Sequence, residues 1–267
     1  MAPYPEHDRI YFTNLLASYG LPAPDHFAAA GRVTFTELVA ALLSDLGAQL
    51  SPFDLALMTS VTSDSELGWP MCYLRHVLPD TGLAFAVADQ GVVAPFTALH
   101  LAVQRVRTGG ARRVLLVMLD QAALLHDGQV PDRMRVEGNA GVALALDASD
   151  TGGAAVSAVH SRRVDRSDVA GLWTRLVGQA RDSSDLAITA VCGLGLLDTL
   201  PASPPAETAA PAPGVPCTGI WQTFLTRLPQ WRTTGRRLLL ADYDPELGRL
   251  AHCLIDIRPE VPATSAT

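Results

Sequence analysis

Lysine is absent from this sequence: all 20 basic residues are arginine, against 27 acidic residues. Chemistry that depends on a lysine amine, such as Schiff-base formation or the lysine of a phosphate-binding loop, is therefore excluded. The formal net charge is −7, and no basic stripe runs along the chain. A nucleic-acid surface is not expected, because phosphate contacts require clustered positive charge.

Cysteine is scarce as well, and no two cysteines have the Cys-x-x-Cys spacing. The sequence therefore indicates neither a zinc site nor a disulfide framework, and no bound metal or cofactor is expected. We predict buried free thiols at Cys72, Cys192, Cys217 and Cys253.

Long apolar runs are also missing, since none approaches the roughly 20 residues that cross a bilayer. The acidic, proline-containing N-terminus lacks the basic and apolar regions of a signal peptide. We expect a cytoplasmic protein.

Apolar residues are nevertheless plentiful, at 48% of 267 residues, and they can bury a large core in one compact domain. We divide the chain into an N-terminal arm (1–33), a first α/β half (34–150), a second α/β half (151–258) and a tail (259–267). The arm is expected to be irregular, because prolines interrupt its short apolar patch. The tail is expected to fray.

The pattern is centred on residues 83–119. Apolar runs at Leu83–Val87 and 114–119 flank a segment with helical spacing, which has Pro95 in its first turn and two glycines after its end. This order predicts a βαβ unit, with both strands in a parallel sheet covered on both faces. The turn before the helix is where such folds place chemistry, and Asp89 with Gln90 is predicted to cap the helix.

Other elements repeat this rhythm on either side. Thr34 and Glu37 form a predicted capping box at the start of a helix. Strands are expected at 53–59, 142–147, 154–159, 186–192, 238–241 and 251–257, and helices at 70–78, at 167–180 and over about ten residues from 220. A loop is expected at 193–195, an exposed linker at 201–216, and an exposed acidic hairpin turn at Asp242, Asp244 and Glu246.

Residues 89–102 resemble the nucleophile motif of the ketosynthases, the condensing enzymes of the thiolase fold. Asp89 and the block Ala98-Leu99-His100-Leu101-Ala102 match that motif without a gap. Residues 137–141 resemble the Gly-Asp-Gly-Ala segment of the family, and residues 191–196 resemble its catalytic Ala-His-Gly-Thr-Gly-Thr loop. Residues 236–257 resemble its closing strand pair, although 242–246 replace the usual glycine-rich turn. The likeness covers roughly residues 34–257.

The resemblance implies a thiolase-like α/β fold. Two pseudo-repeated α/β halves would form a layered α-β-α-β-α arrangement, with the N-terminal part shortened.

The same resemblance places the family's catalytic residues on side chains that cannot replace them. The nucleophilic cysteine falls on Val92, and the two histidines fall on Cys192 and Val215. An isopropyl group is neither a nucleophile nor a hydrogen-bond donor. The apolar neighbours of Cys192 should raise its pKa and lower its reactivity. We therefore expect no catalytic residue.

What the resemblance implies is a non-catalytic subunit of the chain-length-factor type. It would pair with an active ketosynthase, as a heterodimer or heterotetramer, in polyketide or fatty-acyl-derived biosynthesis, and would help to shape the acyl-chain tunnel. Residues 83–88 would form a sheet shared with the partner, and the phosphopantetheine arm of an acyl carrier protein would engage the complex. The residues implied at the interface or tunnel are Phe85, Val87, Asp89, Gln90, Val92, Val93 and Phe96.

Two other classes of function remain open. The same cleft could serve an acyltransferase or hydrolase with Cys192 or Thr97 as its nucleophile. Alternatively, the chain could be a homodimeric binding protein for acyl chains or acyl carriers.

Overall fold

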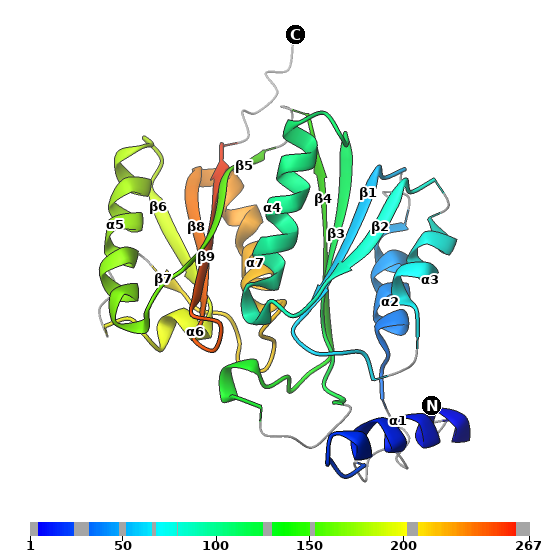
Figure 1. The fold of residues 1–267 in the computed structure, drawn as a ribbon. Coiled ribbons are helices and arrows are strands. Elements are labelled where there is room, and N and C mark those ends of the chain that lie inside the picture. The colour runs from blue at the N-terminus through cyan, green and yellow to red at the C-terminus, as the bar shows by residue number, and fades with distance from the viewer. Residues whose placement is uncertain are drawn as a thin grey trace.

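The protein is built in five layers, in which two β-sheets enclose a pair of helices and carry further helices on their outer faces (Figure 1). This computed structural model describes residues 5–23, 32–47, 52–65, 68–78, 80–124, 130–149, 153–201 and 208–259. Helices α4 and α7 lie between the sheets, α2 and α3 cover one outer face, and α5 covers the other (Figure 1). The predicted α-β-α-β-α arrangement is therefore confirmed.

The first half carries a sheet with strand order β2-β1-β3-β4 in the described residues. Strands β1, β2 and β3 are parallel, with β1 in the middle, and β4 pairs antiparallel with β3. The elements in chain order are α2 (Phe35–Leu46), β1 (Leu55–Ser60), α3 (Pro70–Val77), β2 (Leu83–Val87), η3 (Gly91–Val93), α4 (Ala94–Arg107), β3 (Arg113–Asp120), η4 (Asp132–Met134) and β4 (Ala140–Asp147).

The second half carries a sheet with strand order β5-β9-β8-β6-β7. Strands β6, β7 and β8 are parallel, and β9 is antiparallel to both β8 and β5. Its elements are β5 (Ala154–Arg163), η5 (Arg166–Asp168), α5 (Val169–Asp182), β6 (Ile188–Cys192), α6 (Leu194–Leu197), β7 (Thr208–Ala209), α7 (Gly219–Thr234), β8 (Arg236–Asp244) and β9 (Arg249–Ile257).

The two sheets repeat one pattern, as predicted. In each, three parallel strands are followed by one antiparallel strand, so that β2-β1-β3-β4 corresponds to β7-β6-β8-β9. The second sheet has an additional strand, β5, beside its antiparallel strand. Within the described ranges nothing occupies the equivalent position beside β4, which agrees with the predicted shortening of the N-terminal part.

Strand β2 corrects one expectation. Strand β3 is buried on both faces, whereas β2 ends the first sheet, and Leu83 and Phe85 are 52% and 36% exposed. The apolar run of β2 therefore marks an uncovered edge strand and not a central one. A continuous apolar run does not distinguish the two positions.

The N-terminal arm is also different from the prediction, because residues Glu6–Ser18 form a helix, α1. Pro5 is its N-cap and Pro22 follows its end, so these prolines bound the helix and do not interrupt it. Other boundaries moved as well: residues 194 and 195 of the expected loop belong to α6 (Leu194–Leu197), and α7 is 16 residues long. The tail that we expected to fray, beyond residue 259, and part of the expected linker lie outside the described residues.

One apolar core lies between the sheets and joins the two halves. It combines side chains of β1, β3 and α4 with those of α7, β8 and β9. The rings of Phe96 on α4 and Trp221 on α7 pack with their centroids 5.4 Å apart. Burial of aromatic surface of this size contributes strongly to stability.

Local signals in the sequence were reliable where they involve neighbours only. The Thr34 hydroxyl accepts a hydrogen bond from the backbone N–H of Glu37, and the Glu37 carboxylate accepts one from the Thr34 N–H, which confirms the predicted capping box.

All four cysteines were predicted to be buried. Cys72 is exposed, which corrects that prediction, and the other three are buried. Cys72 lies two positions before Leu74, the buried residue of α3, and therefore on the opposite side of that helix.

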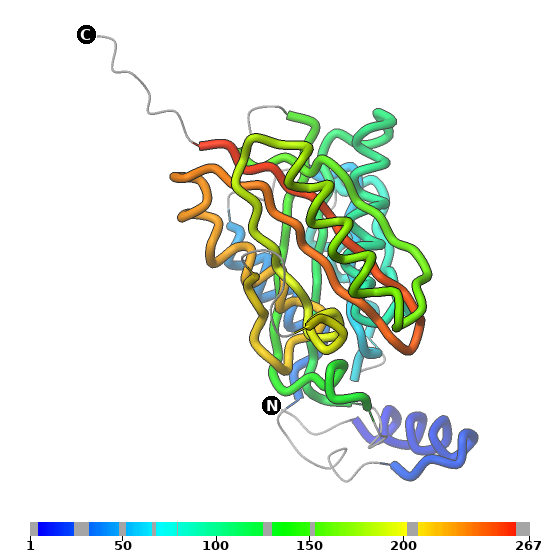
Figure 2. The backbone as a smooth tube through the Cα atoms, turned by 90° about the vertical axis from the view of Figure 1, so that its left-hand side faces the viewer, coloured from blue at the N-terminus to red at the C-terminus, as the bar shows by residue number. Residues whose placement is uncertain are grey.

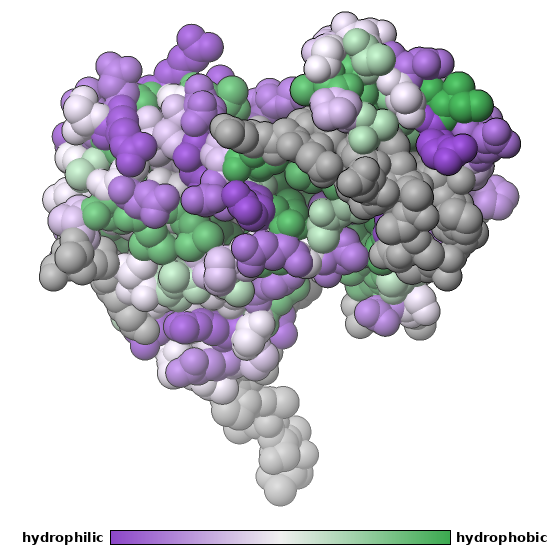
Figure 3. All heavy atoms as spheres, turned by 90° about the horizontal axis from the view of Figure 1, so that it is seen from below, coloured by the Kyte–Doolittle hydropathy of each residue, from purple (hydrophilic) through white to green (hydrophobic). Residues whose placement is uncertain are grey.

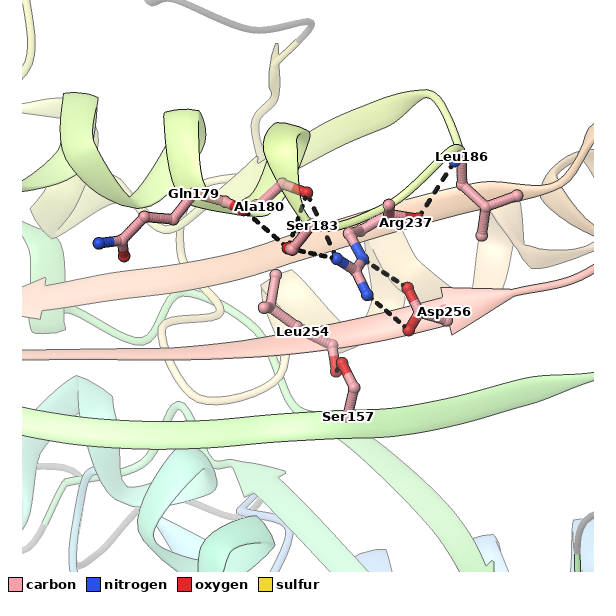
Figure 4. A network of polar contacts seen from close by, with 9 residues as sticks. Ser157, Gln179, Ala180, Ser183, Leu186, Arg237, Leu254 and Asp256 are labelled. Carbon is pink, nitrogen blue, oxygen red and sulfur yellow. Dashed lines mark hydrogen bonds and ion pairs between the residues drawn. The ribbon is translucent and has the colours of Figure 1, made fainter.

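A bidentate ion pair ties the second sheet to α5 (Figure 4). Arg237 of β8 lies opposite Asp256 of β9, with Nε to Oδ1 at 2.6 Å and Nη2 to Oδ2 at 2.9 Å. The third guanidinium nitrogen, Nη1, donates to Ser183 Oγ at 2.7 Å, just after the end of α5.

No helix in the described part of the chain is both long enough and apolar enough to cross a membrane.

We predict that Asp256→Ala lowers the free energy of unfolding by about 2 kcal/mol, because the hydrogen-bonded guanidinium of Arg237 loses its charged acceptor. Urea denaturation measures this change. The matched control is Glu246→Ala, which removes the same charge from a pair with Arg133 in which the Glu246 side chain is 65% exposed, and it should cost less than about 1 kcal/mol. Equal losses in the two variants would show that the Arg237 network has no special role.

Candidate functional site

The turn between β2 and α4 holds the position that matches the family's nucleophile. Asp89 and Gly91 both have positive φ, at 58° and 52°, so the chain reverses sharply and Val92 enters the first turn of η3 and α4. Asp89 is exposed, and neither it nor Gln90 caps the helix with its side chain, which corrects that prediction.

The carboxylate of Asp244 fills the place of the predicted cap. Its Oδ2 accepts a hydrogen bond from the backbone N–H of Val92 at 3.1 Å. Its Oδ1 accepts from the N–H groups of Glu246 and Leu247, at 3.0 Å each. Asp244 is the last residue of β8 and is fully buried. The side chain therefore links the hairpin of the second half to the central turn of the first.

Gly91 is required at this contact. A Cβ atom added there would lie 1.9 Å from Asp244 Oδ2, and the positive φ of Gly91 already disfavours any other residue. The position of the Asp244 carboxylate therefore depends on glycine at position 91.

The other half of the molecule contains a matching contact. Asp120 is the last residue of β3, and its carboxylate accepts from the N–H groups of Cys217 and Thr218, at 3.0 and 2.8 Å, where α7 begins. Burial raises the pKa of Asp120, against the effect of these hydrogen bonds. Each half thus places a strand-end aspartate at the N-terminus of the central helix of the other half, where negative charge is favoured.

The side chain of Val92 offers no chemistry. It is 2% exposed and packs in the core between the sheets. Backbone N–H groups at such a turn are the donors that stabilise an oxyanion in acyl transfer. Here the Val92 N–H is already bonded to an anion of the chain itself, and the side chain beside it carries no nucleophilic atom.

Cys192 does not join this site. Its side chain packs with Leu196, Tyr243 and residues of α5 on the outer side of the second sheet, whereas its neighbour Val191 belongs to the core that contains Val92. Burial, followed by the nearby Asp242, raises the pKa of the Cys192 thiol. Cys192 is therefore a protonated packing residue. Thr97, the other candidate nucleophile, is half-buried on α4.

Val215, the position that matches the family's second histidine, lies where the motif-like segment 137–141 meets the segment 214–219. It is half-buried, and its carbonyl accepts from the N–H of Gly219 at 2.8 Å as α7 begins. The carbonyl of Gly214 accepts from the N–H of Glu137 at 2.9 Å. The segments 137–141 and 214–219 therefore meet, although Val215 contributes no polar side-chain group.

The predicted interface and tunnel residues separate into two groups. Phe85, Val87, Asp89 and Gln90 are exposed or half-buried along β2 and its turn. The remaining three, Val92, Val93 and Phe96, are fully buried in the core between the sheets, and their place at an interface or tunnel stays a prediction. The resemblance to ketosynthases suggested them, and their helical spacing is that of a core-facing stripe.

The acidic hairpin is not the exposed turn that we predicted, since Asp242 and Asp244 are buried and only Glu246 is exposed. Asp242 Oδ1 accepts from the N–H groups of Leu196 and Tyr243, at 3.0 and 2.8 Å. Burial raises the pKa of Asp242 to about 7. Within the described ranges, no group of three or more His, Cys, Asp or Glu side chains could hold a metal ion.

Sequence reasoning missed Asp120, Asp242 and Asp244 as functional or structural sites. The available signal was an aspartate at or next to the end of a buried apolar strand. The residues that donate to Asp120 and Asp244 from the opposite half are about a hundred or more positions away, so the sequence could not pair them.

No family model matches the sequence, and no curated protein matches it. Solved structures do match. AbyA1, described as a tetronic acid condensing enzyme, has a TM-score of 0.61 and 16% identity over 83% of this chain and 84% of its own. ChlB3, described as an acyltransferase, has a TM-score of 0.60 and 16% identity over 92% and 93%. The β-ketoacyl-[acyl carrier protein] synthase III of Thermus thermophilus has a TM-score of 0.61 and 16% identity over 91% and 94%.

These likenesses confirm the thiolase-like fold. At 16% identity, these structural matches show a shared fold and do not show a shared activity. The chain is therefore similar in architecture to thiolase-fold condensing enzymes, and its own site decides what it can do.

We predict that Asp242→Asn reduces the pH dependence of stability. The folded protein binds the Asp242 proton more tightly than the unfolded chain, whose ordinary pKa is 3.8, so this group favours the fold at low pH. That contribution is lost as the pH rises from about 4 to about 7. Asparagine keeps the acceptor Oδ1 and does not titrate.

Chemical denaturation from pH 5 to pH 8 should therefore show the wild type losing stability relative to Asp242→Asn, with the difference levelling off above about pH 7. Parallel curves over this range would contradict the assignment.

Proposed function

We propose that this chain is a non-catalytic ketosynthase-like subunit of the chain-length-factor type. It would pair with an active ketosynthase in polyketide or fatty-acyl-derived biosynthesis and help to shape the tunnel for the acyl chain. The observation that carries the proposal is the hydrogen bond from the Val92 N–H to the buried Asp244 carboxylate.

Condensation requires a nucleophile to hold the acyl group and donors to stabilise the developing oxyanion. At the matching turn the nucleophile position is valine, and its N–H donates to a carboxylate. An anionic transition state placed there would be repelled by Asp244. The turn therefore keeps the shape of an active-site elbow and serves to join the two halves.

The edge strand β2 supports the pairing. Leu83, Phe85 and Val87 share one face of this strand, and Leu83 and Phe85 are among the exposed large apolar residues. The outer edge of β2 has no partner strand in the described part of the chain. Such an edge offers unpaired backbone groups to another sheet, and natural proteins usually protect or use it.

The carrier protein enters as a partner of the complex. An acyl group would arrive on the phosphopantetheine arm, react at the ketosynthase partner, and extend toward this subunit. This part of the proposal rests on the likeness in fold to condensing enzymes, which include 3-oxoacyl-[acyl carrier protein] synthases III.

The alternative acyltransferase or hydrolase is not favoured by the site. Cys192 is fully buried and lies in a different apolar cluster from Val92, with its pKa raised by burial. The other alternative, a homodimeric binding protein, would be recognised as a homodimer with bound lipid.

We expect the affinity-tagged chain, purified from its native host, to carry a ketosynthase at equal stoichiometry in native mass spectrometry. The purified chain alone should show no condensing activity. A homodimer that contains bound lipid, or activity of the single chain on acyl and malonyl carriers, would contradict the proposal.

The strand β2 can be tested with a single substitution. Phe85→Asp should weaken assembly with the ketosynthase by about tenfold or more, because it places a charge in an apolar edge-strand contact. Leu225→Asp is the matched control: Leu225 on α7 is similarly exposed, at 38% against 36% for Phe85. Size-exclusion chromatography with quantified subunits measures both, and equal behaviour would locate the interface elsewhere.

A further inference from the structure

A groove runs along α5 on the outer side of the second sheet, away from the central turn. It consists of a cavity of about 600 Å³ at the start of α5 and one of about 340 Å³ farther along, and both are lined by Arg162. Helix α5 crosses in front of the second sheet in Figure 2. Seen from below, the left side of the molecule carries groups of hydrophilic side chains on either side of an apolar band (Figure 3).

Three arginines line the larger cavity: Arg162, Arg163 and Arg175. All three are exposed, and none of their side chains has a hydrogen bond or ion pair with any described residue. Asp165 and Asp168 lie in the same cavity but form no ion pair with these arginines. The whole chain has a net charge of −7, so these three arginines form a local cluster of positive charge without ion-pair partners among the described residues.

The smaller cavity has an apolar floor and an unsatisfied imidazole. Leu176, Leu239 and Leu254 contribute to its lining. His252, also in the lining, is 6% exposed, and its Nδ1 is buried without a hydrogen-bond partner. Unpaired buried polar atoms are rare in folded proteins and point to a missing partner.

The imidazole of His252 is neutral at physiological pH. Burial, with added repulsion from His160 and Arg162, lowers its pKa to about 4. His160 lies directly opposite on β5, with the ring centroids 5.3 Å apart. A neutral ring can donate or accept one hydrogen bond at Nδ1, depending on its tautomer.

We propose that this groove binds a small phosphate ester. The phosphate would be held by Arg162, Arg163 and Arg175, and the organic part would extend over the leucine floor toward His252. Guanidinium groups bind phosphate oxygens in a bidentate manner. The three arginines and two aspartates give the lining of the larger cavity a formal charge of +1, which attracts an anion. A phosphate ester offers three terminal oxygens to the three guanidinium groups, whereas a carboxylate offers two.

Most of the groove faces away from the central turn, because the second sheet lies between the apolar cluster beneath α5 and the core that contains Val92. Leu247 is the exception, since it lines the larger cavity and its N–H donates to Asp244. Ligand binding there does not depend on pairing with a ketosynthase. The two proposals can therefore fail independently.

Isothermal titration calorimetry of the full chain with phenyl phosphate tests the proposal. We expect saturable binding by the wild type, and affinity about tenfold weaker in Arg162→Ala and in Arg175→Ala, since each removes a charge-assisted contact. Arg227→Ala is the matched control, because this exposed arginine on α7 lines neither cavity and its loss changes the net charge equally. It should bind as the wild type does.

Circular dichroism melting of each variant shows whether it is folded, and the two arginine positions give independent variants. Absence of saturable heat up to about 10 mM phenyl phosphate would overturn the proposal. Unchanged affinity in both Arg162→Ala and Arg175→Ala would overturn it equally.

Discussion

The structure depends on a single buried contact, between the N–H of Val92 and the carboxylate of Asp244. It joins the start of the central helix of one half to the hairpin of the other, and it explains why residue 91 is glycine. Asp120 makes the reciprocal contact at the start of α7. Two strand-end carboxylates therefore hold the halves in register from opposite directions, and both sit where helix dipoles favour negative charge.

The same contact decides the chemistry of the central turn. The ketosynthase motif that residues 89–102 resemble has a cysteine at this elbow, whereas here the side chain is apolar and the Val92 N–H donates to the carboxylate of Asp244. The scaffold thus retains β2, the turn and α4, and the side chain at the matching position carries no nucleophilic atom. What remains available to other molecules is the uncovered strand β2 and, on the far side of the second sheet, the groove along α5.

The sequence predicted elements that depend on neighbouring residues. The Thr34–Glu37 capping box, the order β2, α4, β3, and the β8–β9 hairpin follow from local spacing, and the structure contains all of them. It could not predict the burial of Asp242 and Asp244, because their partners on α6 and at Val92 are far along the chain. The sequence also could not distinguish prolines that flank a helix, as at α1, from prolines that interrupt a segment. Nor could it distinguish an apolar edge strand, such as β2, from a central strand.

The central claim, that this elbow carries no acyl group, is tested most directly by intact-protein mass spectrometry after incubation with an acyl-N-acetylcysteamine thioester. Under conditions that acylate an active ketosynthase, the mass of this chain should not change, because Val92 has no nucleophilic atom and the thiol of Cys192 is buried and protonated. An increase by one acyl group, mapped by peptide fragmentation to Cys192 or Thr97, would contradict the account.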